Sequence, residues 1–346
     1  MNQIKPDLAI LHLSDLHFGP YLQGVSRIGE WSTFAAPHNY NLLLGMGINI
    51  PGFFRKYGDR LIVVVTGDIT TAAEPPAYEA VNNYLRDFPF VGSDVRVGLK
   101  LHKIRDRMYI VPGNHDIWLY GGFFTRWKRF TNRRDEFLRY FREPLPNAYP
   151  RVINGMSVTL YTIDTNKVRK WINPLNFTNV LGRGEVGDEQ IGELLALHAN
   201  LNSKKPKDSL EDFQYGSSLK IALMHHHLAL PPDIPDSLQQ KLVELDDAQA
   251  VLNLLCGIGV RLVLCGHQHF PYQISDLKAK NKPGHSLFLS CAGSTTQLEC
   301  DKNSFYVYEI TDKHNGTYNL DVLLYTADAE SSNYFFEPQD IKTFVI

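Results

Sequence analysis

Five apolar runs in this chain end on side chains that can bind metal ions. The endings are S-D-L-H-F-G at 14–19, T-G-D-I-T at 66–70, P-G-N-H-D at 112–116, M-H-H-H at 224–227 and C-G-H-Q-H at 265–269. Carboxylate, amide and imidazole groups together make a mixed oxygen and nitrogen donor set, which suits Mn, Fe or Zn better than Ca. One such ending is typical of an ordinary surface turn, but five in one chain indicate a shared metal site.

The runs that carry these endings have the length and residue types of buried strands. The expected strands cover 8–13, 60–67, 107–113, 157–164, 219–224 and 261–266. Apolar residues at helical spacing lie between several of them, and the expected helices cover 77–88, 123–141, 188–201 and 246–257. Strands that alternate with helices predict an α/β domain whose sheets are covered by helices. Strand ends in such a domain converge on one crevice, so groups from position 15 to position 269 can meet in space.

After residue 285 the pattern changes to β-like runs separated by turn residues. An antiparallel portion is therefore expected, and the sheets are predicted to be mixed. The sequence contains no internal repeat and no Gly/Ser-rich linker. We expect one domain over 1–346, with the core motifs in 8–270, a β-rich portion in 285–326 that completes the sheets, and a terminal tail in 327–346.

Composition and charge narrow the class of protein. Of the 346 residues, 44% are hydrophobic, which is enough for a full core, and the formal net charge of −2 gives the whole molecule no attraction to nucleic acid or anionic membranes. The four cysteines are too scattered for a disulfide framework or a metal knuckle, and we expect them to be small buried side chains. No apolar run approaches the roughly 18 residues of a membrane span, and the N-terminus lacks a signal-peptide pattern, so a cytoplasmic protein is expected.

The ordered set D-x-H, G-D, G-N-H-D, H and G-H-x-H resembles the calcineurin-like metallophosphoesterase superfamily over residues 8–270. The resemblance implies an α/β fold in which two mixed sheets pack as a sandwich flanked by helices, a four-layer αββα arrangement. It also implies two divalent metal ions at the carboxyl ends of the strands, with a bridging hydroxide as the nucleophile. Mn, Fe and Zn all accept these ligands, and availability decides between them.

The same resemblance implies roles for individual residues. One ion would be held by Asp15, His17 and His269, the other by Asn114, His225 and His267, and both by a bridging Asp68. His115 would point at the substrate, where it could stabilise the transition state or protonate the leaving oxygen. Asp116 would orient His115 and favour its charged form.

The three consecutive histidines leave a choice open. In related enzymes the ligand is the first histidine after this strand, which favours His225, with His226 as the main alternative. His226 and His227 would otherwise pack beside the site, orient a ligand or face the substrate. His12, three residues before Asp15 and inside the first apolar run, is expected to be a core residue.

Two segments depart from the short forms of the bacterial phosphodiesterase branch, which this sequence resembles. Segment 20–59 could wall one side of the site and read the alcohol portion of a substrate, or it could be a helix and loop packed on the edge of a sheet. Segment 123–142 combines an apolar stripe with many arginines. The stripe could face the core with a solvated basic face outside, or that basic face could hold a nucleic-acid backbone.

The predicted function is metal-dependent hydrolysis of phosphate esters, with a phosphodiesterase favoured. The phrases H-L-S-D-L-H-F-G and V-T-G-D-I-T-T-A-A-E are similar to bacterial cyclic-nucleotide and glycerophosphodiester phosphodiesterases, and the D-R-G of Ser/Thr protein phosphatases in the superfamily is missing. A small phosphate ester or nucleotide-like substrate is expected, and nucleic acid is not favoured. The alternatives are a nuclease, a broad phosphomonoesterase, and a non-catalytic interaction scaffold, which the complete set of expected ligands disfavours. The sequence does not predict the oligomeric state.

Overall fold

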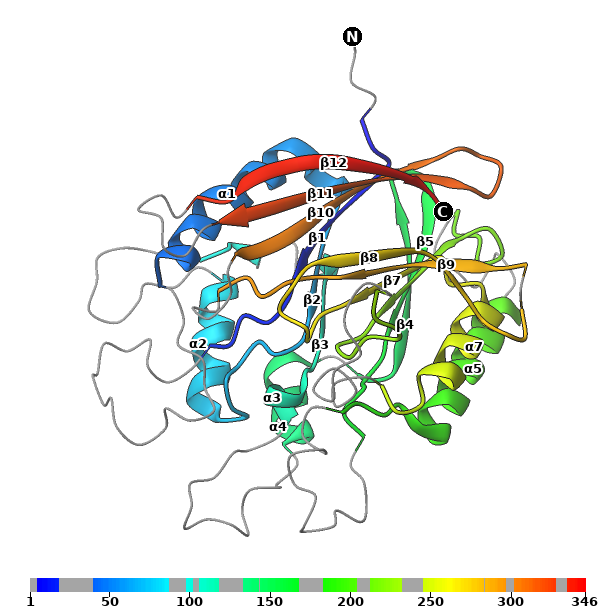
Figure 1. The fold of residues 1–346 in the computed structure, drawn as a ribbon, viewed down its shortest axis with the longest axis horizontal. Coiled ribbons are helices and arrows are strands. Elements are labelled where there is room, and N and C mark those ends of the chain that lie inside the picture. The colour runs from blue at the N-terminus through cyan, green and yellow to red at the C-terminus, as the bar shows by residue number, and fades with distance from the viewer. Residues whose placement is uncertain are drawn as a thin grey trace.

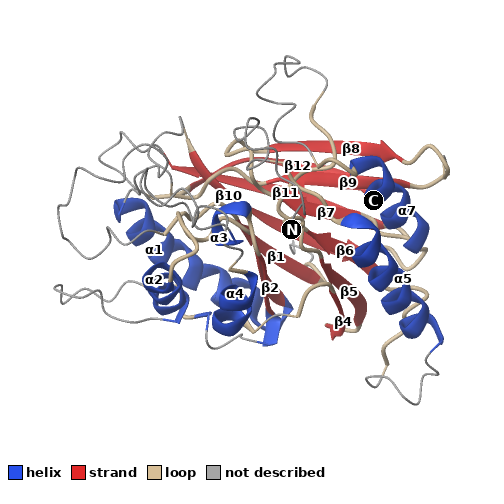
Figure 2. Ribbon diagram, turned by 90° about the horizontal axis from the view of Figure 1, so that it is seen from below, coloured by secondary structure: helices blue, strands red, loops and turns tan. Residues whose placement is uncertain are grey.

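Two six-stranded sheets form the centre of the molecule, and helices cover their outer faces (Figure 1). The structure, a computed structural model, describes residues 5–18, 40–86, 98–101, 106–117, 133–142, 144–167, 183–203, 212–231, 245–282, 284–296, 302–327 and 335–346. Seen from below, the helices form two groups on either side of the strands (Figure 2). The predicted sandwich of two mixed sheets flanked by helices is therefore confirmed.

The first sheet has the strand order β12-β11-β10-β1-β2-β3. Its parallel half consists of β1 (Leu8–Leu13), β2 (Leu61–Thr66) and β3 (Met108–Val111). Its antiparallel half consists of β10 (Asn303–Asp312), β11 (Tyr318–Ala327) and β12 (Glu337–Val345). Every residue of β1 and β2 is buried, because helices cover one face and the second sheet covers the other.

The second sheet has the strand order β4-β5-β6-β7-β9-β8. Four neighbouring parallel strands form its interior: β5 (Met156–Thr162), β6 (Leu219–Leu223), β7 (Leu262–Cys265) and β9 (Ser286–Cys291). The antiparallel strands β4 (Asn147–Ile153) and β8 (Tyr272–Lys278) lie at the two edges. The carboxyl ends of β6 and β7 in this sheet and of β1, β2 and β3 in the other carry the polar endings noted in the sequence.

Alternation along the strands divides the core into layers. Leu8 and Ile10 of β1 pack between the sheets, in one cluster with residues of β5, β6 and β7. Ala9 and Leu11 face the opposite way, toward a cluster that includes Phe53. Successive side chains of a strand point to opposite faces, so a continuous apolar run supplies both layers.

Six helices and one short 3-10 turn, η2 (Gly58–Arg60), occur in the described part of the chain. The outer layer of the first sheet contains α1 (Tyr40–Tyr57), α2 (Pro75–Arg86), α3 (Asn114–Ile117) and α4 (Arg134–Phe141), and that of the second contains α5 (Gly187–Ser203) and α7 (Ala248–Ile258). In α7, Val251, Leu255 and Ile258 are buried against the second sheet. This spacing places them on one face of the helix, which explains why the period was visible in the sequence.

The strands absent from the sequence prediction are β4, β8 and β12. All three lie at sheet edges, where one side has no strand partner in the described residues, and β12 is exposed along most of its length. Edge strands tolerate proline and charged side chains, as Pro150 in β4 and Lys342 in β12 illustrate. They therefore lack the apolar run that marks an interior strand, and 327–346, expected to be a terminal tail, contains β12.

The two long segments fold only partly as expected. Residues 40–57 form α1, which packs on the first sheet as the second interpretation of 20–59 proposed; residues 19–39 lie outside the described residues. The helix expected over 123–141 includes α4, but residue 133 precedes that helix and 118–132 are not described. In α4, Phe137 is buried and Phe141 packs on Tyr78, so the described part of the apolar stripe faces the core.

Two expectations from composition can be compared with the structure. Cys256, Cys265 and Cys291 are buried free thiols, as predicted, and Cys300 lies outside the described residues. Within the described residues, no helix combines the length and the apolar composition that crossing a membrane requires.

Candidate metal centre

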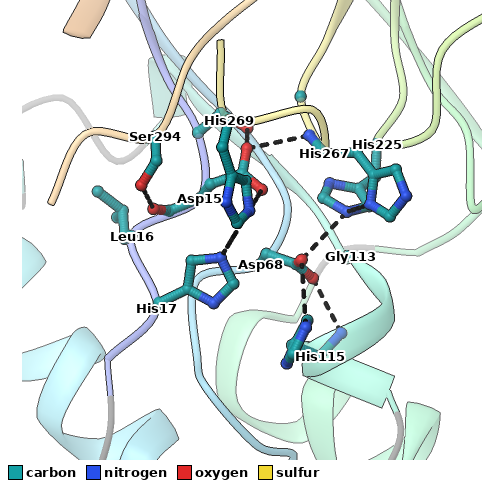
Figure 3. Close-up of polar contacts among 12 residues, drawn as sticks. Asp15, Leu16, His17, Asp68, Gly113, His115, His225, His267, His269 and Ser294 are labelled. Atoms are coloured by element: carbon teal, nitrogen blue, oxygen red, sulfur yellow. Dashed lines mark hydrogen bonds and ion pairs between the residues drawn. The ribbon is translucent and has the colours of Figure 1, made fainter. Parts of the chain in front are cut away.

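The loops that follow β1, β2, β3, β6 and β7 bring their polar side chains together (Figure 3). Four ligand atoms, one each from Asp15, His17, Asp68 and His269, all lie within 4.8 Å of one another, and so do three from His225, His226 and His267. The side chains come from both sheets and from positions up to 254 residues apart, as Asp15 and His269 are (269 − 15). Convergence at the carboxyl ends of the strands is what the sequence predicted.

The first donor set contains Asp15, His17 and His269. The Nε2 atoms of the two histidines are 3.1 Å apart, and Asp15 Oδ1 lies 3.2 Å from His269 Nε2 and 3.9 Å from His17 Nε2. Asp15 Oδ2 accepts hydrogen bonds from the Ser14 hydroxyl at 2.5 Å and the His267 amide at 3.0 Å. Asp15 Oδ1 is buried without a hydrogen-bond partner among the described residues. Its lone pairs therefore converge with the two ring nitrogens, as a cation site requires.

The second donor set surrounds His225 Nε2. This atom lies 3.1 Å from His267 Nδ1, 3.3 Å from Asn114 Oδ1 and 3.4 Å from Asp68 Oδ2. On the other side of the ring, His225 Nδ1 lies 2.7 Å from the carbonyl oxygen of Thr66. A carbonyl only accepts, so Nδ1 carries the hydrogen, and Nε2 is the ring nitrogen that faces the site and would bind a metal ion in place of a proton. The contact with the Thr66 carbonyl thus orients the His225 ring as a candidate metal ligand.

Asp68 lies between the two sets. Its Oδ2 is 3.4 Å from His225 Nε2, and its carboxylate also belongs to the group formed by Asp15, His17 and His269. Burial raises the pKa of the Asp68 carboxyl, but the imidazoles of His225, His115 and His17 outweigh burial and hold that pKa well below its ordinary value. The carboxylate is therefore ionised and available to both donor sets.

The carboxylates give the centre an affinity for positive charge. Burial lowers the pKa of His225, but the Asp68 and Asp15 carboxylates raise it to about 9. Burial and the neighbouring His226 and His225 rings hold the pKa of His267 well below its ordinary value. His225 thus attracts a proton, whereas the neighbouring His267 stays neutral. A divalent cation could contact both rings and the two carboxylates at once, which protons on the single rings cannot do.

Five of the candidate ligands have left-handed backbone conformations. The φ angles of Asp15, His17, Asp68, His267 and His269 are 51°, 46°, 46°, 77° and 57°. Residues other than glycine seldom adopt such angles, which recur at functional sites held by their surroundings. Here the reversal just beyond each strand aims the side chain across the crevice instead of along the strand.

Glycines beside the ligands allow this close approach. A Cβ on Gly113 would overlap the Asp68 carboxylate, and one on Gly266 would overlap the Ser14 hydroxyl. The glycine in G-N-H-D and the one in G-H-x-H are therefore required by packing against ligand loops from other strands.

Residues 8–271 match the family model of the calcineurin-like phosphoesterases. The chain belongs to the calcineurin-like phosphoesterase family. Membership suggests a metal-dependent phosphoester hydrolase, and Asp15 Oδ1, which accepts no hydrogen bond from the described residues, and the converging ring nitrogens fit divalent cations. The match identifies the family, and the bacterial phosphodiesterase branch stays a prediction.

Solved structures include a similar one, the purple acid phosphatase PPD1 from seeds of yellow lupin (Lupinus luteus). The sequence identity is 13% and the TM-score is 0.45, and the match covers 97% of this chain and 53% of the phosphatase chain. This chain thus spans about half of that protein. No curated protein matches the present chain.

The structure brings together the full set of residues that the family motifs indicate. Asp15, His17, Asp68, Asn114, His225, His267 and His269 all lie in the centre, and His115 lies beside it. The His115 side chain is 21% exposed, and its Nε2 is 4.0 Å from Asp68 Oδ2. Its Nδ1 donates to the carbonyl of Thr71 at 3.0 Å, which fixes the ring.

Asp116 has contacts other than those predicted. Its carboxylate accepts from the amides of Ile69, Thr70 and Gly113 at 2.8 to 3.2 Å and from the Thr70 hydroxyl at 2.8 Å. Orientation of His115 by Asp116 was the expectation, and the carbonyl of Thr71 provides it instead. Adjacent residues of a helical turn point about 100° apart, so the Asp116 carboxylate turns inward and joins the loops after β2 and β3.

Of the two other histidines in the triplet, His226 is held by Thr165. Its Nδ1 lies 2.7 Å from the Thr165 hydroxyl, whereas His225 Nε2 faces Asn114 and Asp68. His227 packs beside His267 and Tyr272, with ring centroids 6.4 Å from each. His225 Nε2 thus adjoins Asn114 and Asp68, the His226 ring belongs to the same cluster as His225 and His267, and His225 as the ligand stays a prediction.

Supporting residues outside the motifs were missed in the sequence. Asn166 donates its side-chain amide to the carbonyl of Pro112 at 2.9 Å and so connects the loop after β5 to the loop that carries Asn114. Thr66 and Ser14 hold His225 and Asp15, as described above. Ser14 and Thr66 directly precede motif residues, and this position could have marked them as supporting residues. Asn166 has no such mark in the sequence, because its partner Pro112 is distant along the chain.

Proposed function

We propose that the protein is a phosphodiesterase that hydrolyses small or nucleotide-like diesters at a pair of divalent metal ions. The observation that carries the proposal is the presence of two adjoining donor sets that share the Asp68 carboxylate. The first ion would be held by Asp15, His17 and His269, and the second by Asn114, His225 and His267. Imidazole, carboxylate and amide donors accept Mn, Fe or Zn.

The charges of the centre suit an anionic substrate. When bound, the metal pair supplies Lewis acidity toward the phosphoryl oxygens and a water acidic enough to attack phosphorus. The two buried carboxylates, Asp15 and Asp68, offset only half the charge of two divalent ions. The remaining positive charge attracts a phosphate ester and stabilises the negative charge that develops as the ester bond breaks.

His115 is the proposed proton donor to the leaving oxygen. The bond from Nδ1 to the Thr71 carbonyl turns Nε2 toward the centre, and the partly exposed side chain lies where a substrate could reach it. An imidazolium at Nε2 would give its proton to the alkoxide as the bond from phosphorus to oxygen breaks, and would regain a proton from solvent.

One feature supports a diester over a monoester. The motif phrases resemble those of phosphodiesterases, as noted above. For the nuclease alternative, two of the four described arginines of segment 123–142 are paired within the protein, Arg134 with Asp164 and Arg139 with Glu136.

The test compares bis-p-nitrophenyl phosphate with p-nitrophenyl phosphate after loading the protein with Mn, Fe or Zn. We expect turnover that a chelator abolishes, a higher kcat/KM for the diester, and loss of both activities in Asp68→Ala. Faster hydrolysis of the monoester would contradict the diester assignment. Absence of turnover of both esters by metal-loaded protein would contradict catalysis itself and leave the scaffold alternative.

A further inference from the structure

Three consecutive hydroxyl side chains contact the loop that carries Asp15 and His17. Ser294, Thr295 and Thr296, hereafter the hydroxyl row, follow β9, lie outside the 8–271 family match and are fully buried. Their hydroxyls donate to the carbonyls of Asp15 at 2.8 Å, Ser14 at 3.0 Å and Leu16 at 2.5 Å, respectively. Each carbonyl of this three-residue stretch thus receives its own hydroxyl.

The backbone of the hydroxyl row reaches a second ligand loop. The Ser294 amide donates to the carbonyl of His269 at 3.3 Å, and the Thr295 amide donates to the carbonyl of Ser14 at 3.2 Å. Figure 3 shows Ser294 directed at the Asp15 backbone on the side of the centre away from His225. The row therefore contacts the segments that carry Asp15, His17 and His269.

These contacts explain how the ligand loop keeps its unusual backbone. Asp15 and His17 have positive φ angles, so the chain leaves the β1 ladder abruptly and its carbonyls lose their strand partners. Buried carbonyls need donors, and side-chain hydroxyls are short enough to supply them within a packed core. Without the row, the same stretch would favour a backbone that directs Asp15 and His17 elsewhere.

We propose that Ser294, Thr295 and Thr296 are positioning residues for the ion held by Asp15, His17 and His269. This inference rests on the proposed metal centre. The second donor set is held chiefly by other contacts, namely Thr66 to His225 and Asn166 to Pro112, and it meets Asp15 through the His267 amide at 3.0 Å. The hydroxyl row therefore acts mainly on one ion of the pair, although it lies outside every metal-binding motif.

The selective effect distinguishes positioning from a general contribution to stability. A row that only stabilised the fold would weaken both ions equally or neither. A row that positions one ligand set weakens one ion, because residues that orient ligands typically contribute 10- to 100-fold to metal affinity. The readout is metal binding by the intact chain and does not depend on catalysis.

The experiment titrates Mn²⁺ into metal-free protein by calorimetry and measures bound metal by elemental analysis. The variants are Thr296→Val, the combination Ser294→Ala, Thr295→Val and Thr296→Val, and the hydroxyl-retaining pair Thr295→Ser and Thr296→Ser. Thr159→Val is the matched control, since Thr159 is equally buried and its hydroxyl pairs with Ser218 at 3.0 Å in the second sheet.

We expect the combined variant to lose at least about tenfold in affinity for one ion and to keep the other, while the serine pair and Thr159→Val match wild type. Thr296→Val gives the same selective loss at smaller magnitude and decides the question if the combined variant does not fold. Wild-type affinity for both ions in Thr296→Val, or equal weakening of both, overturns the inference. A wild-type protein that binds no metal overturns the proposed function instead.

Discussion

At the residue scale, the atoms that surround each ring nitrogen decide how a histidine of the triplet can contribute to the centre. His225 gives the hydrogen of Nδ1 to the Thr66 carbonyl and so directs the lone pair of Nε2 at Asn114 and Asp68. His226 meets the Thr165 hydroxyl through Nδ1. Both rings are thus held through Nδ1, and what distinguishes His225 is that its Nε2 lies beside Asn114 and Asp68.

We predict that His225→Ala lowers metal content from about two ions per chain to about one, because it removes a central donor of the second set. His226→Ala should retain most of the metal, since it leaves His267, Asn114 and Asp68 around His225 Nε2. Elemental analysis of both purified variants measures the difference. Full metal content in His225→Ala together with a loss in His226→Ala would reverse the assignment.

His115 should affect catalysis without affecting metal binding. We expect His115→Gln to keep its metal and to lower kcat by roughly 10²- to 10⁴-fold for an alkyl ester, whose leaving oxygen needs a proton. The loss should be smaller for a nitrophenyl ester, because nitrophenolate leaves without protonation. Steady-state rates on the two esters give the comparison, and equal losses on both would argue against proton donation.

At the scale of elements, the site is made by abrupt strand ends. Parallel strands of both sheets stop at one rim, and a left-handed residue beyond β1, β2 and β7 turns a ligand across the crevice. Glycines make room where loops from different strands cross. Gly113, after β3, lies against the Asp68 carboxylate from the loop after β2. The loops are therefore interdependent.

Gly113→Ala tests this dependence. The added methyl group would overlap the Asp68 carboxylate, so we expect this variant to lose metal from both sets and to unfold at lower temperature. Gly192→Ala in α5 is the control, since a methyl group there meets no described atom within 4 Å and alanine favours helix. Unchanged metal content in Gly113→Ala would show that the loop can shift without cost to the centre.

At the scale of the whole molecule, a buried histidine inside the sandwich makes the free energy of unfolding depend on pH. His12 is fully buried in β1, with Nδ1 3.1 Å from the Tyr308 hydroxyl and Nε2 2.8 Å from the Thr66 hydroxyl. Burial lowers the pKa of His12 from 6.5 to about 3. The sequence-based expectation that His12 is a core residue is confirmed.

The depressed pKa fixes the direction of the pH dependence. Above pH 6.5 His12 is neutral in both the folded and the unfolded chain, and its contribution to stability is fully present. As the pH falls from 6.5 toward 3, only the unfolded chain takes up the proton, so the unfolding free energy decreases by up to about 1.4 kcal/mol per pH unit.

Urea unfolding of wild type and His12→Gln across this range should show a shallower dependence of the unfolding free energy on pH in the variant. His314→Gln, at a side chain 89% exposed, serves as the control, and identical slopes in wild type and His12→Gln would refute the assignment.

The sequence and the structure agree best where packing imposes a pattern. Interior strands such as β1 and β2 are buried on both faces and must be apolar throughout, so their positions could be read directly. Edge strands β4, β8 and β12 are paired on one side and tolerate polar residues and proline, so the sequence left them unmarked. Complete burial of a strand leaves a signal in the sequence, and partial exposure leaves little.

By itself, the sequence determined which residue types could form the centre, because ligand chemistry and strand endings are local properties. Asp15, His17, Asp68 and the later motif residues were therefore identifiable before any coordinates. Only the tertiary structure decided how these residues are held. The carbonyl of Thr71 contacts His115 where Asp116 was expected, the Thr165 hydroxyl contacts His226 Nδ1, and the hydroxyl row contacts the loop after β1 across some 280 positions of sequence. Such contacts depend on which hydrogen-bonding atoms face each other after folding, and no spacing along the chain records that.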